Sequence, residues 1–218
     1  MNQGMNQEEA IAMKITWIGH SCFKVESGGY ELVLDPYCNG AVPGLADVKE
    51  TADAVLCSHE HGDHNARGNV TLRTGGTCPF KITEIAAWHD DTQGSQRGSN
   101  TIHVLDDGHY KIAHMGDLGC DLTPEQAEKL SGLDCLLIPV GGFFTIDGAK
   151  AAEIVKQLKP VLTIPMHFRS DKFGFDMIGM VDEFTSRFPD VDQIGGSSIE
   201  LETYGKSGIA LLEPKNLL

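Results

Sequence analysis

Positive charge is scarce in this chain of 218 residues, and long apolar runs are lacking. Lys and Arg number 17 against 31 Asp and Glu, which gives a formal net charge of −14. Because nucleic acids and anionic membrane surfaces are bound through clustered basic residues, this balance argues against both as partners. No apolar stretch approaches the roughly 18 residues that a membrane span requires. With 41% hydrophobic and 22% charged residues, the composition is that of a globular protein.

The sequence also lacks Cys-x-x-Cys pairs and the features of a secretory signal. Its six cysteines are scattered, and residues 1–13 contain neither a basic start nor an apolar core segment. We therefore expect reduced cysteines and a cytoplasmic protein. We interpret residues 1–13 as a disordered or extended segment that precedes a single domain over residues 14–218.

Short apolar runs separated by Gly, Asp and Asn predict strands in the first half of the chain. These expected strands are Lys14–Ile18, Cys22–Val25, Tyr30–Leu34, Ala54–Cys57, Lys81–Trp88, Thr101–Leu105 and Tyr110–His114. In the second half, strands alternate with helices. The helices expected there are Pro124–Leu130, Gly148–Leu158 and Phe175–Phe188, and the strands are Cys135–Pro139, Val161–Pro165, Ser198–Leu201 and Gly208–Leu212. Two β-rich halves with helices outside fit this order, as does a less regular α/β sheet.

The most informative segment is Ser58–His64 (SHEHGDH), which directly follows the strand Ala54–Cys57. Imidazole and carboxylate groups are the ligands that a borderline cation such as Zn²⁺ prefers. Two of the histidines can point to one side of the turn, while Asp63 and His64 reach a second point a few ångströms away, which is the spacing of a two-metal site. The segment therefore predicts metal binding, and the alternative is a solvated loop rich in histidine.

One segment cannot complete such a site, so further ligands are expected at the ends of later strands. His89, Asp117 and His167 each follow a short apolar run, and loops at strand ends converge on functional sites. Each of these residues also has a structural alternative when taken alone: a loop histidine, a turn aspartate and a core histidine.

The motif HEHGDH resembles the HxHxDH signature of the metallo-β-lactamase superfamily, and the later His, Asp and His follow in that superfamily's order. The segments ITWIGHSCFKVE, LVLDPY, RGSNTIHV, AHMGDLG and IPMHF look like those of its branch of small prokaryotic metal-dependent hydrolases, the branch similar to L-ascorbate-6-phosphate lactonase. The resemblance covers about residues 14–212. It implies an α+β fold, a four-layer αββα sandwich with the metals at one edge between two sheets.

The resemblance also implies a ligand set. The first metal would be held by His59, His61 and His89, the second by Asp63, His64 and His167, and Asp117 would bridge the two. Asp35, in LVLDP, occupies the position of an acidic residue that supports the ligands in relatives; a turn aspartate before Pro36 is its alternative. The expected cofactors are two divalent metal ions, with zinc as the leading candidate and manganese, iron and nickel also compatible with these ligands.

Such a site predicts a metal-dependent hydrolase. Two ions about 3.5–4 Å apart lower the pKa of a shared water towards roughly 7, so that a bridging hydroxide can attack a carbonyl or phosphoryl centre. Asp63 would also orient the hydroxide, and His20 would serve as a proton donor or hydrogen-bond partner, with a structural role as its alternative. The expected substrate is a small anionic molecule of the lactone or phosphodiester type.

Residues outside the ligand set are expected to bind the substrate. They are Arg97, Asn100, Phe143 and Arg169. Arginine binds a carboxylate or phosphate with two hydrogen bonds, and an aromatic side chain can form the wall of a pocket. In the structural alternatives, Arg97 pairs with Asp90 or Asp91, Asn100 bonds the backbone and Phe143 packs in the core.

Two other functions remain open from the sequence. One is a metal-binding protein without turnover, and the other is an iron-dependent redox enzyme on the same fold. Metal content combined with activity on esters, lactones and phosphodiesters would separate the first from a hydrolase. Neither the native metal nor the assembly state can be derived from the sequence, and a homo-oligomer is left open.

Overall fold

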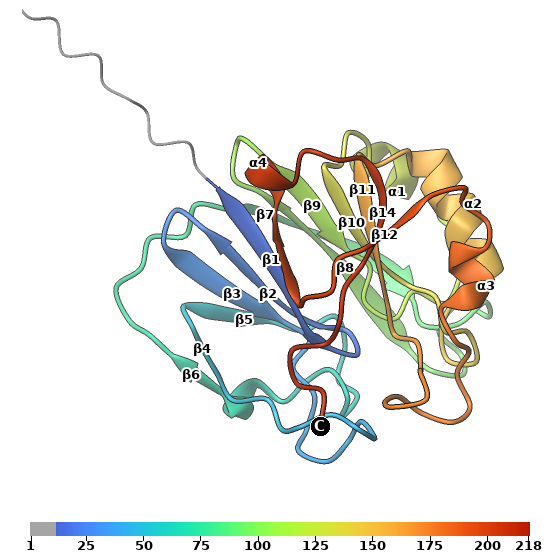
Figure 1. Ribbon diagram of the computed structural model, residues 1–218, viewed down its shortest axis with the longest axis horizontal. Coiled ribbons are helices and arrows are strands. Elements are labelled where there is room, and N and C mark those ends of the chain that lie inside the picture. The colour runs from blue at the N-terminus through green and yellow to red at the C-terminus, as the bar shows by residue number, and fades with distance from the viewer. Residues whose placement is uncertain (1–11) are drawn as a thin grey trace, which may run out of the picture.

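The computed structural model describes residues 12–218, whose strands form two main sheets that face each other (Figure 1). The predicted N-terminal segment lies almost wholly outside the described residues, which begin after residue 11. Met13 was assigned to that segment, but it is the first residue of a strand and is fully buried.

The smaller main sheet has the strand order β13-β1-β2-β3-β5. Its strands are β1 (Met13–Gly19), β2 (Cys22–Ser27), β3 (Tyr30–Leu34), β5 (Ala54–Leu56) and β13 (Ser198–Glu200). The first three strands are antiparallel neighbours, whereas β3 and β5 run parallel. Two strands that we did not predict, β4 (Glu50–Ala52) and β6 (Val70–Leu72), form a separate parallel pair, and the 3₁₀ turn η1 (Arg67–Asn69) precedes β6.

The larger sheet has the order β12-β14-β11-β10-β9-β8-β7. Its strands are β7 (Lys81–Trp88), β8 (Ser99–Asp106), β9 (Lys111–His114), β10 (Cys135–Pro139), β11 (Leu162–Met166), β12 (Val191–Gln193) and β14 (Gly208–Leu211). The pairs β7–β8 and β8–β9 are antiparallel, and β9, β10 and β11 run parallel. β10 and β11 are buried along their whole length, as expected for central parallel strands.

Four helices accompany the sheets in the described part of the chain. They are α1 (Pro124–Lys129), α2 (Gly148–Leu158), α3 (Asp182–Thr185) and α4 (Leu201–Tyr204). α2 and α3 pack together beside the larger sheet, where α2 contacts β10 (Figure 1). Asp147 caps the start of α2 by accepting a hydrogen bond from the Lys150 amide, and the apolar residues of α2 are buried.

The predicted helix Phe175–Phe188 is wrong, because only Asp182–Thr185 is helical. Apolar residues recur at helical spacing there, but the backbone of Gly179 bonds to other loops. Its amide donates to the Gly141 carbonyl at 2.6 Å, and its carbonyl accepts from the Arg169 amide at 3.0 Å. These tertiary hydrogen bonds replace the intrahelical ones.

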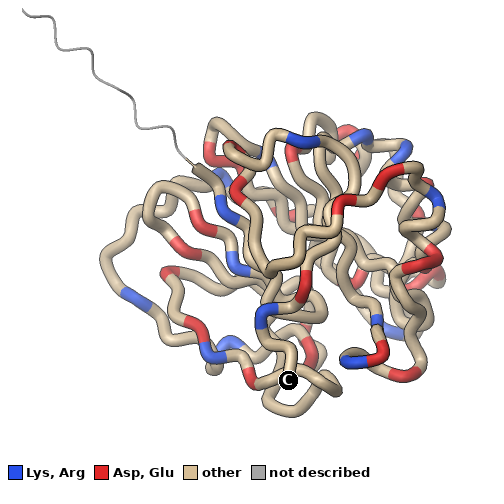
Figure 2. The backbone as a smooth tube through the Cα atoms, in the orientation of Figure 1, with Lys and Arg blue, Asp and Glu red and all other residues tan. Residues whose placement is uncertain are grey.

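The hydrophobic core lies between the two sheets. Phe23 of β2 and His114 of β9 meet edge to face across this space, with ring centroids 5.9 Å apart. Lys and Arg positions alternate with Asp and Glu positions along the backbone of both halves (Figure 2). In residues 12–218 no helix is long and apolar enough to cross a bilayer. All six cysteines are free thiols.

Candidate metal centre

Strand ends deliver the predicted ligands to one place. His20 follows β1, the segment Ser58–His64 follows β5, and His89 directly follows β7. Asp117 lies three residues after β9, and His167 directly follows β11. Segments far apart in the sequence, and from both sheets, thus form one cluster.

Asp117 lies at the centre of this cluster. Its Oδ2 atom is surrounded by the Nε2 atoms of four histidines, which lie 3.1 Å (His64), 3.3 Å (His89), 3.3 Å (His167) and 4.0 Å (His59) away. Asp117 is 1% exposed, so its carboxylate is surrounded by imidazoles and not by water. The predicted bridging residue therefore lies between the two predicted ligand groups.

The first group, which we call the open group, consists of His59, His61 and His89. Their ligating atoms lie within 4.8 Å of one another. The ring centroids are 4.6 Å apart for His59 and His61 and 4.7 Å apart for His59 and His89. His59 and His89 are buried, whereas His61 is exposed, so this group opens to solvent.

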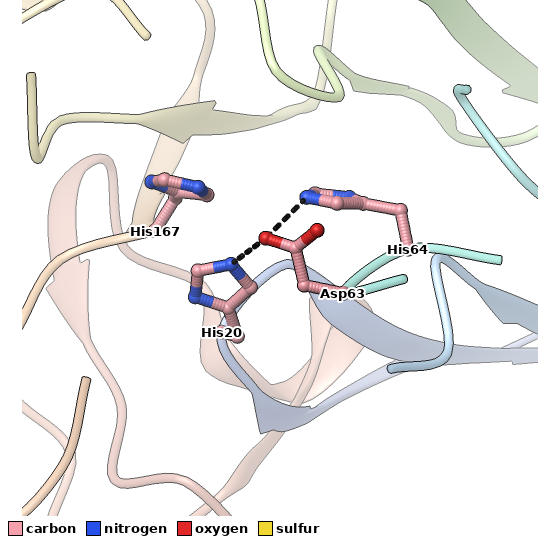
Figure 3. Close-up of side chains that lie close together, drawn as sticks. All are labelled: His20, Asp63, His64 and His167. Carbon is pink, nitrogen blue, oxygen red and sulfur yellow. Dashed lines mark hydrogen bonds and ion pairs between the residues drawn. The ribbon is translucent and has the colours of Figure 1, made fainter. Parts of the chain in front are cut away.

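The second group, which we call the buried group, consists of His20, Asp63, His64 and His167 (Figure 3). The Asp63 carboxylate lies between His20 and His64, at 3.3 Å and 3.6 Å from their Nε2 atoms. The ring of His20 lies 4.1 Å from that of His167. The three histidines are at most 1% exposed and Asp63 is half-buried. His20 therefore joins the three residues predicted to hold the second metal.

Hydrogen bonds on the far nitrogens fix the orientation of three imidazoles. The Nδ1 atom of His89 donates to the Phe144 carbonyl at 3.1 Å, and that of His64 donates to Asp35 at 2.8 Å. The Ser58 hydroxyl donates to Asp35, so it accepts from Nδ1 of His59 at 2.9 Å. In all three rings the proton is therefore on Nδ1, which leaves the Nε2 lone pair free to bind a cation.

Asp35 has the supporting role that the sequence suggested. It is fully buried at the end of β3, and it accepts hydrogen bonds from the Ser58 amide, the Ser58 hydroxyl and His64 at 2.6, 2.5 and 2.8 Å. Burial acts to raise the pKa of Asp35, but the nearby His114 imidazole and the hydrogen bonds from His64 and Ser58 lower it to about 2. A permanently ionised carboxylate thus holds ligands of both groups.

Burial and mutual repulsion keep two of the clustered imidazoles neutral. Burial, followed by the neighbouring His64, lowers the pKa of His59 to about 3. Burial, followed by His167, lowers the pKa of His20 to about 4. His64 differs: burial acts against its charge, but Asp117 and Asp35 outweigh it and raise its pKa. A positive charge is therefore stabilised at this point, either as a proton on His64 or as a bound cation.

The backbone is strained at three of these positions. His20, Asp35 and His167 have φ angles of 55°, 45° and 53°, in the left-handed region that residues other than glycine rarely adopt. Such conformations persist only where the surrounding structure enforces them, and they concentrate at functional sites. The turns of the cluster are thus held in shape by the fold.

The donor set fits divalent cations. Four buried atoms that face the cluster have no hydrogen-bond partner within residues 12–218: Nε2 of His59, His64 and His167 and Oδ1 of Asp117. Unpaired buried polar atoms are costly unless a ligand satisfies them. Imidazole nitrogens and carboxylate oxygens are ligands for zinc and for several other transition metals.

A cleft of about 540 Å³ leads to the cluster. Members of both groups and Asp117 form its base, and its other lining residues are Ala41, Gly62, Arg97, Phe144, Phe175 and Met177. Among these lining residues Arg97 is the only Lys or Arg. The cleft therefore combines a cluster of ligands, one cation and an apolar wall.

Of the four residues predicted to bind the substrate, Arg97 lines the cleft and the other three do not. Arg97 lines the cleft, with its guanidinium 5.7 Å from the centre of the Phe144 ring. Phe143 is 63% exposed and does not line the cleft, whereas its neighbour Phe144 does. Arg169 lies outside the lining and donates from Nε to the Ile178 carbonyl at 2.9 Å.

The prediction that Asn100 binds the substrate is corrected, because this side chain has a structural role. It is 1% exposed, and both ends of its amide bond the backbone. Nδ2 donates to the Met115 carbonyl and Oδ1 accepts from the Asp117 amide, both at 2.9 Å. Both polar atoms of the side chain therefore bind the backbone, as in its structural alternative, and Asn100 does not line the cleft.

The alternative for Arg97, an ion pair with Asp90 or Asp91, does not hold. Asp90 accepts five hydrogen bonds from its own loop: from the amides of residues 92, 94, 96 and 97 and from the Thr92 hydroxyl, at 2.7–3.0 Å. Within residues 12–218 the Arg97 guanidinium forms no ion pair. Asp90 thus folds the loop that presents Arg97, and it leaves the guanidinium available.

Some contributors to the site were not predicted. Ser58 was quoted only as the start of the histidine segment, yet it links His59 to Asp35. Phe175 and Met177 were assigned to a helix, which concealed their place in the cleft. Ser58 could have been noticed because it directly precedes a predicted ligand, but nothing in the sequence distinguishes Phe175 and Met177 from core residues.

Comparison with known proteins agrees with this arrangement. A family model described as the beta-lactamase superfamily domain matches residues 14–167. A UPF0173 metal-dependent hydrolase of Nitratidesulfovibrio vulgaris is 31% identical over 193 residues, which cover 71% of this chain and 80% of that protein. Another, from Carboxydothermus hydrogenoformans, is 30% identical over 193 residues, or 72% of this chain and 85% of that protein.

Solved structures show the same fold. A metallo-beta-lactamase superfamily protein of Thermotoga maritima is 30% identical with a TM-score of 0.72, over 92% of this chain and 98% of that one. Igni18, a metallo hydrolase of Ignicoccus hospitalis, shares 22% identity and the fold, with a TM-score of 0.63 over 93% and 96% of the two chains. The predicted fold is thus confirmed, while the closer likeness to L-ascorbate-6-phosphate lactonase stays a prediction. The chain belongs to the metallo-β-lactamase superfamily, among its UPF0173 metal-dependent hydrolases.

Proposed function

We propose that this protein is a hydrolase whose site holds two divalent metal ions, with zinc as the leading candidate. The open group, His59, His61 and His89, would hold one ion, and Asp63, His64 and His167 of the buried group would hold the other. Asp117 would bridge them. One observation carries the proposal: the Asp117 carboxylate lies within 3.1–4.0 Å of four Nε2 atoms that come from three separate turns, after β5, β7 and β11. The hydrolase names of the relatives support the reaction class.

When bound, two such ions supply a hydroxide nucleophile at neutral pH and polarise the carbonyl or phosphoryl oxygen under attack. The residues of the chain position the reactants. Asp63, with one edge toward the cleft and the other toward His20, is placed to orient the nucleophile. His20 is buried behind Asp63 and does not line the cleft, so we assign it to holding that carboxylate and not to protonating the leaving group.

We propose a small anionic substrate, of the lactone or phosphodiester type. Arg97 would bind its negative group, since a guanidinium without an ion-pair partner can bind a carboxylate or phosphate with two hydrogen bonds. The side chains of Phe144, Phe175 and Met177 would contact the rest of the molecule. A volume of about 540 Å³ suits a small molecule.

The test combines metal content with turnover. We would measure metals by elemental analysis in protein purified without supplementation, and assay hydrolysis of esters, lactones and bis(p-nitrophenyl) phosphate. Two equivalents of metal and turnover on at least one class are expected. Asp63→Ala and His61→Ala should each abolish hydrolysis and lower the metal content, while circular dichroism shows a folded protein.

His109→Ala is the matched control, since this exposed histidine lies in the turn between β8 and β9, away from the His114 end of β9. It should keep both metal content and activity. Full activity of the Asp63 variant would refute the role of that residue. Two metals without turnover on any class would favour a metal-binding protein, the alternative left open by the sequence.

A further inference from the structure

Two buried side chains that do not line the cleft hold the turn that carries Asp117. Asn100 lies on β8, and His114 is the last residue of β9. Both are at most 1% exposed. The turn consists of Met115, Gly116 and Asp117, and every one of its residues is bound by one of these two side chains.

The contacts come in sequence along the turn. The Asn100 amide group donates to the Met115 carbonyl at 2.9 Å, and its oxygen accepts from the Asp117 amide at 2.9 Å. Between these two contacts, the Gly116 amide donates to Nδ1 of His114 at 3.1 Å. Only glycine fits here: φ is +55°, and a Cβ atom would lie 2.3 Å from the Asn100 oxygen.

His114 also connects this turn to the other sheet. Because its Nδ1 accepts from Gly116, the proton is on Nε2, which donates to the Ser21 carbonyl at 2.8 Å. Ser21 follows His20 in the turn after β1. One imidazole therefore joins the turn of Asp117, in the larger sheet, to the turn of the buried group in the smaller sheet.

We propose that Asn100 and His114 are positioning residues that set the place of the Asp117 carboxylate between the two ligand groups. The inference rests on the proposed two-metal site. A shared ligand must be held to within about 0.5 Å by groups that are themselves locked. The two side chains meet this need because they fix the backbone that leads into Asp117, from the Met115 carbonyl to the Asp117 amide, and His114 also ties this turn to the turn of His20.

His103 provides a matched control. It lies on β8 directly opposite His114 in the β8–β9 register and is 2% exposed. Its nearest charged group is Glu84, with Nε2 3.7 Å from the carboxylate, and its Nδ1 has no partner. Replacing it changes a buried imidazole of the same sheet without touching the turn.

The experiment is a titration of the metal-free full-length chain with Co²⁺, which reports both the number of ions and their ligand field by absorption. Asn100→Ala and His114→Ala should weaken the binding of at least one of two equivalents by about 10–100-fold and alter the Co²⁺ spectrum, as other outer-shell changes do. His103→Gln should leave both dissociation constants unchanged. Thermal unfolding of the metal-free proteins checks their folding.

Two isosteric variants keep the test decisive even if the alanine variants fail to fold. In His114→Asn the amide oxygen replaces Nδ1 and still accepts from Gly116, whereas in His114→Gln the amide nitrogen replaces Nε2 and still donates to Ser21. We expect tighter Co²⁺ binding in His114→Asn than in His114→Gln, because only the former holds the turn of Asp117.

Wild-type protein that binds fewer than two equivalents would refute the proposed two-metal function. Wild-type protein that binds two equivalents, with Asn100→Ala and His114→Ala binding both at wild-type affinity and with an unchanged spectrum, would refute only the positioning role. Equal Co²⁺ binding in His114→Asn and His114→Gln would also overturn it.

Discussion

The open and buried groups share Asp117 but differ in their surroundings. In the open group His61 is exposed and lines the cleft, and Arg97 lies in the same lining. In the buried group the three histidines are at most 1% exposed, and two of them, His20 and His167, occupy strained backbone positions. One group is therefore accessible to small molecules and the other is fixed inside the fold.

This difference suggests that the two groups have different roles in binding cations. A ligand group held by strained, buried turns is pre-organised and should retain its cation, whereas an exposed group can exchange its cation and meet the substrate. Both depend on Asp35, which binds His64 directly and His59 through Ser58. The predictions below test whether the two groups can be separated.

The largest effect is expected from Asp117→Ala, which removes the carboxylate that, within residues 12–218, lies within 4.0 Å of imidazoles of both groups. Binding of both cations should weaken by more than about 100-fold, the upper end of the range for outer-shell partners. Isothermal titration with Zn²⁺ measures this. Retention of one equivalent at wild-type affinity would show that the groups bind independently.

Asp35→Asn should have the next largest effect, and chiefly on the buried group. The amide lacks the charge that orients His64, so one Zn²⁺ equivalent should weaken by about 10–100-fold while the other changes less. The matched control is Asp53→Asn, because Asp53 forms comparable bonds to the Glu31 amide and Arg73 away from the site. Equal weakening of both equivalents would show that Asp35 supports the two groups to the same extent.

Arg97→Ala tests the substrate side of the open group. The KM for anionic substrates should rise about tenfold, equivalent to about 1.4 kcal/mol, with little change in kcat or in the KM for neutral substrates. Arg67→Ala is the control, because Arg67 is ion-paired with Glu60 and lies outside the cleft lining. Equal changes for neutral and anionic substrates would return Arg97 to a structural role.

The smallest effect is a difference in the rates of metal removal. On addition of a chelator to the Co²⁺ protein, the equivalent held by the open group should leave first, because His61 gives solvent access to it. Stopped-flow absorbance should show two phases. In His61→Ala the fast phase should vanish; its persistence would contradict the assignment.

The sequence predicted most strands, and the place of the candidate ligands, because both depend on local patterns. Short apolar runs identified most strands to within a residue or two, and the candidate ligands lie in the turns that follow those runs. His89 and His167, for example, follow β7 and β11 without any intervening residue. The motif HEHGDH further restricted the fold through its resemblance to one superfamily.

What the sequence could not predict depends on contacts between distant segments. The helix expected at Phe175–Phe188 failed because Gly179 bonds Gly141 and Arg169 instead of its own neighbours. Asn100 was assigned to the substrate from its side-chain chemistry, but its partners, Met115 and Asp117, are brought to it only by strand pairing.

The sequence also did not show which of the two adjacent phenylalanines lines the cleft. Phe143 was expected in the pocket, but its backbone adopts a φ of 59° and its ring turns to solvent. Phe144 enters the cleft, and its carbonyl holds His89. A local backbone conformation, invisible in the sequence, decides which ring lines the cleft.

The loop that Asp90 organises has a consequence for engineering. Five hydrogen bonds to one carboxylate shape the segment from within, and its base is closed by the His89 amide bonded to the Gly98 carbonyl. We therefore expect that this loop can be exchanged between homologues as a unit, with His89 and Gly98 as its two fixed ends. New selectivities could then be introduced on this scaffold while the histidine and aspartate cluster stays unchanged.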